Sequence, residues 1–203
     1  MRRAAAAVLI ALVALGILTA TACEPVDEAS PAAGPDRGAV MVIGDSLTVG
    51  AGAEGGLDER LRAHGFDPAV VAVPGQDVSW GLDEVVARTS VPSLVIVELG
   101  TNPDANVAGF AEQVNALVAA LRDHGAEHIA WLTPIHTVIR RYEDKIDVLE
   151  AAAAAGAIVV ADWRAVVVDH PEWMSRDGIH YTTEGYEALA RFLTATAVDL
   201  ADT

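Results

Sequence analysis

Short apolar runs recur along residues 39–203, and segments with helical spacing separate them. In the clearest helical segment, Phe110, Val114, Leu117, Val118 and Leu121 lie on one face, and the pattern ends near Gly125. The apolar runs are short and nearly continuous, which is typical of strands buried on both faces. Strands are therefore predicted at 39–45, 68–75, 93–102, 128–134 and 157–163.

Further helices are predicted at 77–90, 140–155 and 184–201, with Asp77 as the N-cap of the first. The Gly-rich stretch that starts at Gly50 is expected to be a loop leading into a helix that ends near Gly65. Strands that alternate with helices require crossover connections and hence a parallel sheet. The pattern predicts an α/β domain over 39–203.

The N-terminus has a different pattern. Residues 1–3 are basic at two positions, 4–20 are almost entirely apolar, and small residues precede Cys23. This order is typical of a secretory signal peptide, which we place at 1–22. Residues 23–38 are rich in Pro, Ala, Gly and acidic residues, as in a flexible tether.

Cys23 is the only cysteine of the chain, so no intrachain disulfide can form. Residues 18–23 resemble a bacterial lipoprotein signal, in which the cysteine is lipidated and becomes the new N-terminus. The alternative is ordinary cleavage after an Ala-x-Ala site, with Cys23 incidental. We predict a secreted protein or a lipoprotein on the outer face of the membrane, with no membrane contact besides that anchor.

Composition excludes some partners and leaves others open. The formal net charge is −16, which opposes binding to nucleic acid. His124 and His128 have helical i, i+4 spacing, but Gly125 between them ends the helix, and no zinc-type Cys/His set is present. No metal or other cofactor is expected, and the protein is predicted to be a monomer.

Polar residues follow the first three predicted strands. Asp45 and Ser46 come after the first strand, Gly75 and Gln76 after the second, and Asn102 ends the third. Ligands of open parallel sheets bind beyond the carboxyl ends of the strands. Ser46 is therefore a candidate nucleophile, although a Gly-Asp-Ser stretch also favours a simple turn.

A second set of candidates lies near the C-terminus, where Asp177 and His180 are three residues apart before the last predicted helix. An activated serine needs a base within hydrogen-bond reach, and the base needs an acceptor that orients it. His180 could take the proton of Ser46 while Asp177 holds the imidazole. A lone D-x-x-H is a weak signal, and its pairing with Ser46 makes it specific.

These motifs resemble the SGNH, or GDSL-type, hydrolase superfamily. The matching blocks are G-D-S-L at 44–47, Gly75, G-T-N at 100–102 and D-G-I-H at 177–180. The resemblance implies a three-layer, flavodoxin-like α/β/α fold with a five-stranded parallel sheet of order 2-1-3-4-5. It also implies that Ser46, His180 and Asp177 form a catalytic triad. The oxyanion hole would comprise the backbone N–H groups of Ser46 and Gly75 and the side-chain amide of Asn102.

One block departs from the family pattern. Many members have an acid directly after the asparagine, whereas Pro103 follows Asn102 here and Asp104 comes one position later. With this altered block and the stretch 161–180, the sequence resembles the extracytoplasmic SGNH domains of cell-wall O-acetyltransferases.

Weaker candidates have simpler alternatives. Thr48, Gln76 and His136 are candidate substrate-binding residues, or polar loop residues without a role. Asp45 is expected to fix the nucleophile turn by hydrogen bonding. Trp163 and Trp173 are expected to pack in the interior more readily than to wall a pocket.

The resulting hypothesis is an extracytoplasmic serine esterase that forms an acyl-Ser46 intermediate from a small ester or an acylated glycan. One alternative is an acyltransferase that O-acetylates cell-envelope glycans. The other is a noncatalytic glycan-binding module that has kept the fold, against which the complete set of site residues argues.

Overall fold

The computed structural model describes residues 35–102, 106–135 and 142–203, which belong to one compact unit, 33–203. The strands are β1 (Gly38–Gly44), β2 (Phe66–Ala72), β3 (Leu94–Glu98), β4 (His128–Leu132) and β5 (Val159–Ala161). The helices are α1 (Ser46–Ala53), α2 (Leu57–Ala63), α3 (Val78–Val86), α4 (Val107–Asp123), α5 (Tyr142–Ala154), α6 (Trp163–Val167) and α7 (Thr183–Ala201), with a 3₁₀ helix at Pro171–Trp173.

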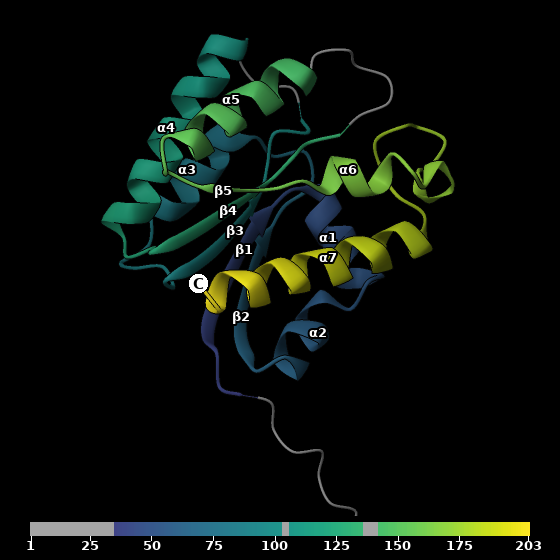
Figure 1. The fold of residues 1–203 in the computed structure, drawn as a ribbon, viewed down its shortest axis with the longest axis horizontal. Coiled ribbons are helices and arrows are strands. Elements are labelled where there is room, and N and C mark those ends of the chain that lie inside the picture. Colours follow the sequence, from purple (N-terminus) through teal and green to yellow (C-terminus); the bar gives the residue numbers. More distant parts are fainter. Residues whose placement is uncertain (1–34, 103–105, 136–141) are drawn as a thin grey trace, which may run out of the picture. The chain divides into compact units, whose positions relative to one another are not determined.

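The five strands form one parallel sheet in the order β2-β1-β3-β4-β5, which confirms the predicted fold class and strand order. Helices α3, α4 and α5 cover one face, and α1, α2 and α7 cover the other (Figure 1). Alternate residues of β1 enter the two cores: Val40 and Val42 pack towards α7, and Met41 and Ile43 pack towards α4. This period-2 alternation explains why the strand is apolar throughout.

The prediction of a loop at Gly50 was wrong, because α1 runs from Ser46 to Ala53. The glycine reflects close packing: a Cβ at Gly50 would lie 2.1 Å from Cε1 of Tyr186 on α7. Asp45 caps the helix, since its side chain accepts a hydrogen bond from the Leu47 N–H. The nucleophile candidate therefore occupies the first turn of a helix packed against α7.

The end of the fifth predicted strand also differs. The strand stops at Ala161, and Trp163 begins α6, with Asp162 as its N-cap. The predicted Asp77 cap of α3 is confirmed, because its side chain accepts a hydrogen bond from the Trp80 N–H.

Several sequence-based predictions lie outside the described residues: the signal peptide, Cys23 and most of the tether, and also Pro103, Asp104 and His136. Within the ranges that are described, no helix combines the length and apolar character needed to cross a membrane.

Candidate active site

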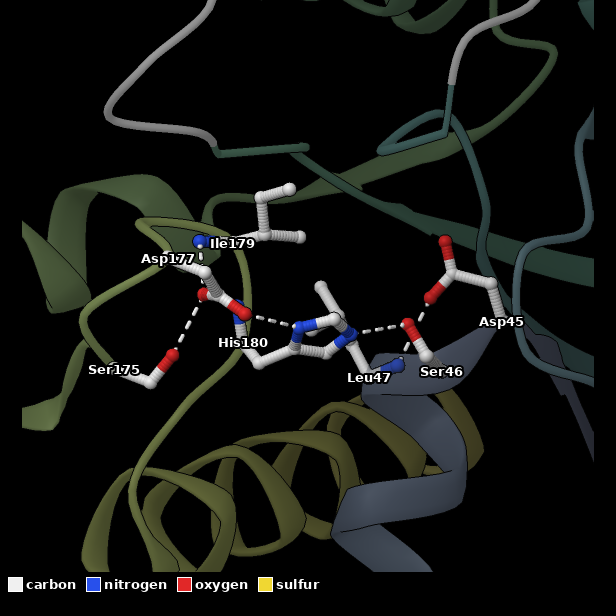
Figure 2. Close-up of polar contacts among 7 residues, drawn as sticks. All are labelled: Asp45, Ser46, Leu47, Ser175, Asp177, Ile179 and His180. Carbon is white, nitrogen blue, oxygen red and sulfur yellow. Dashed lines mark hydrogen bonds and ion pairs between the residues drawn. The ribbon is translucent and has the colours of Figure 1, made fainter.

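Ser46 lies where β1 ends and α1 begins, and its side chain meets His180. Ser46 Oγ is 3.0 Å from His180 Nε2, and His180 Nδ1 is 2.7 Å from Asp177 Oδ2 (Figure 2). The serine and the D-x-x-H segment are separated by 134 positions in the chain, and the fold brings them into one hydrogen-bonded line. This is the geometry that an activated serine requires: nucleophile, base and orienting carboxylate, each within hydrogen-bond reach of the next.

Asp177 is held by its own loop. Its Oδ1 accepts hydrogen bonds from the Ser175 hydroxyl (2.6 Å) and from the backbone N–H groups of Ile179 (2.9 Å) and His180 (3.0 Å). These bonds, the one from Ser175 above all, together with the contact to the His180 ring, hold the pKa of the Asp177 carboxyl well below its usual range. Asp177 is therefore an anion, and its other oxygen remains for the imidazole.

Aromatic side chains pack against the loop that carries Asp177 and His180. The Trp163 indole is buried, donates to the Tyr181 hydroxyl at 2.8 Å and stacks on Trp173 with ring centroids 6.2 Å apart. His170 stacks on the Trp173 ring, at 3.8 Å. An antiparallel bridge between Met174 and Tyr181 closes the turn that carries Asp177 and His180. As expected, the two tryptophans serve packing, and they fix the loop that presents the base.

The candidate oxyanion donors Ser46, Gly75 and Asn102 follow the carboxyl ends of β1, β2 and β3. Gly75 has φ 78°, a left-handed conformation that favours glycine. Within the described ranges, no acceptor is assigned to the backbone N–H of Ser46 or of Gly75, so both are available as donors. Helix geometry explains why the Ser46 N–H is available, because the N–H groups in the first turn of a helix have no partner inside the helix.

Asn102 differs from the simple expectation of a free donor. Its Nδ2 donates to Asp45 Oδ2 at 2.7 Å and to the backbone oxygen of Gln76 at 2.9 Å. Both amide protons are thus used in this structure, one on a carboxylate and one on a carbonyl oxygen. The Asn102 amide could donate to an oxyanion only if it gave up one of these two acceptors, the Asp45 carboxylate or the Gln76 oxygen.

Glu98, the last residue of β3, is a component of the site that sequence reasoning missed. It is 5% exposed, and its Oε2 accepts hydrogen bonds from the Thr48 hydroxyl (2.9 Å) and the Thr48 N–H (3.2 Å). Burial, and then the neighbouring Asp45 charge, raise the pKa of Glu98 well above its usual value. Burial also raises the pKa of Asp45, to about 6. An acid inside an otherwise apolar strand run was the available signal.

Two side chains of α5 hold the backbone around Asn102. Lys145 Nζ donates to the Gly100 oxygen at 2.7 Å, and the Tyr142 hydroxyl donates to the Thr101 oxygen at 2.9 Å. The Lys145 ammonium also lies 4.9 Å from the centre of the Phe110 ring. This support was not predicted, because contacts between a helix and a distant loop leave no local pattern in the sequence.

The weaker candidates separate into different roles. Thr48 does not line the site, contrary to the prediction, because it is fully buried and its hydroxyl donates to Glu98. Gln76 contributes its backbone oxygen to the site. His136 is not among the described residues. Over the described part of the chain, no group of three or more His, Cys, Asp or Glu residues could hold a metal ion.

A model of the GDSL-like lipase/acylhydrolase family matches residues 42–188, which contain Ser46, Asn102, Asp177 and His180. The chain belongs to this family. The predicted resemblance is thereby confirmed, and the matched range holds all four blocks that carried it.

The relatives of this GDSL-family protein include an esterase and an O-acetyltransferase. An arylesterase of Vibrio mimicus is 25% identical over 177 residues, which cover 78% of this chain and 88% of that protein. The O-acetyltransferase OatA of Staphylococcus aureus (strain NCTC 8325 / PS 47) is 35% identical over 104 residues, which cover 50% of this chain and only 16% of that protein.

Solved structures agree with the fold. TesA superposes with a TM-score of 0.66 at 25% identity, covering 80% of this chain and 99% of TesA. The C-terminal catalytic domain of the Streptococcus pneumoniae peptidoglycan O-acetyltransferase OatA, solved with a methylsulfonyl adduct, gives a TM-score of 0.64 at 23% identity. That match covers 81% of this chain and 94% of the solved domain.

Proposed function

We propose that the protein is a serine esterase that hydrolyses carboxylic esters through an acyl-Ser46 intermediate. The observation that carries this proposal is the continuous line from Ser46 Oγ to His180 Nε2 (3.0 Å) and from His180 Nδ1 to Asp177 Oδ2 (2.7 Å). The arylesterase similarity over most of both chains supports the same reaction class.

In the proposed reaction, Ser46 Oγ attacks the ester carbonyl carbon while His180 Nε2 takes the hydroxyl proton. The backbone N–H groups of Ser46 and Gly75 stabilise the oxyanion, and the Asn102 amide joins them after releasing the Gln76 oxygen. His180 then returns the proton to the leaving alcohol, and an acyl-enzyme remains. A water molecule, deprotonated by His180, repeats the sequence and frees the acid.

Hydrolysis of p-nitrophenyl esters by the wild type and two variants tests this proposal. Ser46→Ala and His180→Ala should each abolish turnover and leave the fold intact, because Ser46 and His180 are only half-buried and the cores do not depend on them. Full activity of the Ser46→Ala variant would end the assignment.

A second candidate is an acyltransferase, in which a sugar hydroxyl, not water, resolves the acyl-enzyme. The similarity to OatA favours it, both in sequence over half of the chain and in fold. The discriminating experiment supplies an acetyl donor with glycan fragments and measures both products by mass spectrometry. Acetylated fragments that exceed free acetate would make the protein a transferase.

The location and partners belong to the same proposal. We place the protein outside the cytoplasm, either secreted or anchored through a lipid on Cys23, where an acylated envelope glycan or a small ester would be the substrate. The basic, apolar and small-residue order of 1–22 supports export. The mass of the mature N-terminus would distinguish the lipid-anchored form from the freely secreted form, because only the mass of the anchored form should change when cells are treated with globomycin.

A further inference from the structure

The carboxyl group of Glu98 meets three donors behind the nucleophile. Its Oε2 accepts from the Thr48 hydroxyl (2.9 Å), the Thr48 N–H (3.2 Å) and the Asp45 N–H (3.4 Å). All donors that reach Glu98 from the described residues go to this one oxygen, so Oε1 remains for another contact. The side chain therefore ties the end of β3 to the turn that carries Ser46.

Asp45 is the second carboxyl group of this interior, and it is fully buried. Its Oδ1 accepts from the Leu47 N–H (2.9 Å) and its Oδ2 from the Asn102 amide (2.7 Å). The two side chains meet at the same turn, because the Asp45 N–H donates to the Glu98 oxygen that also accepts from Thr48. Burial disfavours the charged form of both neighbouring carboxyl groups, and two negative charges side by side repel each other, so one of the pair carries a proton.

The surrounding charges favour one proton on the pair. His180 is the basic group that acts on Asp45, and when protonated it favours the Asp45 anion. Tyr181, after the D-G-I-H motif, and Tyr186, on α7, interact electrostatically with the pair, and burial raises the pKa of both phenols, so they stay neutral. The negative charge of Asp45 is the charge that acts most strongly on Glu98, and it raises the pKa of the Glu98 carboxyl.

The hydrogen bonds decide which group holds the proton. Asp45 accepts N–H donors at both of its oxygens, as an anion does, and the charge of a protonated His180 favours that anion. From the described residues Glu98 accepts hydrogen bonds at Oε2 alone, which matches the carbonyl oxygen of a neutral acid whose Oε1–H donates to Asp45.

We propose that Glu98 is a neutral carboxylic acid whose proton, donated to Asp45, holds the Ser46 turn and the Asn102 amide in position for acyl transfer. Glu98 is thus a positioning residue, which acts through Asp45 and Thr48 and does not touch the substrate. The catalytic consequence rests on the proposed function, whereas the protonation itself does not.

The proton has a measurable effect on stability. In the unfolded chain Glu98 ionises at its ordinary pKa of about 4.3, while the native chain keeps the proton. Native protein therefore binds one more proton, and unfolding becomes easier as pH rises. In Glu98→Gln, an amide replaces the neutral acid and this proton is absent.

The first experiment is urea unfolding of the full chain, wild type and Glu98→Gln, followed by tryptophan fluorescence at several pH values. From about pH 6.5, where Asp45 is ionised, the ratio of the wild-type unfolding constant to that of Glu98→Gln should rise about tenfold per pH unit, until Glu98 ionises. Parallel curves, or a Glu98→Gln variant that does not fold, would overturn the proposal.

The second experiment compares ester hydrolysis by Glu98→Gln and Glu98→Met. The amide can donate to Asp45 and accept from Thr48, so it should keep most of the wild-type kcat. The thioether can do neither, and kcat should fall on the order of 100-fold, since small misplacements near the chemistry cost that much. Equal kcat values in the two variants would overturn the positioning role.

The unfolding experiment and the ester-hydrolysis experiment distinguish a failure of this inference from a failure of the proposed function. If the wild type hydrolyses no ester but the unfolding curves diverge with pH, the proposed function fails and the neutral acid stands. If the wild type is active and the curves stay parallel, the neutral acid fails alone. Should Glu98→Met not fold, Thr48→Val, which removes one donor to Glu98, replaces it and should lower kcat more than Glu98→Gln does.

Discussion

Replacing Asp177 with asparagine changes one atom of the side chain that orients His180. Two of the three donors at Asp177 Oδ1 are backbone N–H groups, from Ile179 and His180, at 2.9 and 3.0 Å. An asparagine keeps these bonds only if its oxygen takes the Oδ1 place, which turns its NH₂ towards His180 Nδ1. The amide then donates to Nδ1 and moves the ring proton to Nε2, where Ser46 needs an acceptor.

The opposite orientation of the amide would restore the correct tautomer at the cost of those backbone bonds. Each lost bond costs about 1 kcal/mol, so the productive orientation lies about 2 kcal/mol or more above the other and is a minor population. The negative charge that stabilises the imidazolium is lost as well. In a comparable triad this substitution lowers kcat by about 10,000-fold. We expect a loss of about 1,000- to 10,000-fold here.

The assay is kcat and KM for a p-nitrophenyl ester, with thermal unfolding to verify the fold. Ser175→Ala is the matched control, because it removes one neighbouring donor to Asp177 Oδ1 and leaves the carboxylate facing His180. It should lose less than about tenfold, since Asp177 remains an anion near neutral pH. An Asp177→Asn variant that retains more than a tenth of wild-type kcat would refute the tautomer argument.

Two further predictions test the surroundings of the nucleophile. Gly50→Ala places a Cβ 2.1 Å from the Tyr186 ring, whereas Gly52→Ala in the same helix meets nothing within 4 Å. In urea unfolding, Gly52→Ala should therefore be more stable than Gly50→Ala by about 1–3 kcal/mol. Equal stabilities of the two variants would contradict the packing of Gly50 against Tyr186. Asn102→Ala should lower kcat about 100- to 1000-fold with little change in KM, and a loss of less than threefold would mean that its amide never leaves the Gln76 oxygen.

The sequence predicted the sheet because buried parallel strands leave a clear apolar pattern, and it predicted the triad because its motifs are local. Helix α1 was missed because its glycines are typical of a loop. The Tyr186 ring, from the other end of the chain, explains Gly50, which it contacts, and no local pattern shows that contact. Local signals also recovered the Asp77 cap of α3.

The contacts of Glu98 and Lys145 were missed for a related reason. Glu98 lies in an apolar run, and only the fold shows that Asp45 and Thr48 meet it. Lys145 reaches the Gly100 oxygen from a helix 45 positions away. Asn102 was predicted as an oxyanion donor, but its contact with the Gln76 oxygen depends on two loops whose relative position the sequence does not encode locally.

The most direct test of the account is the intact mass of the full chain after treatment with a fluorophosphonate, with Ser46→Ala as the control. The probe phosphonylates a serine hydroxyl only where a base activates it, so it reports on the Ser46–His180 contact without a known substrate. The account predicts a single adduct on the wild type and none on Ser46→Ala. A wild type without an adduct, or an adduct that persists in Ser46→Ala, would contradict it.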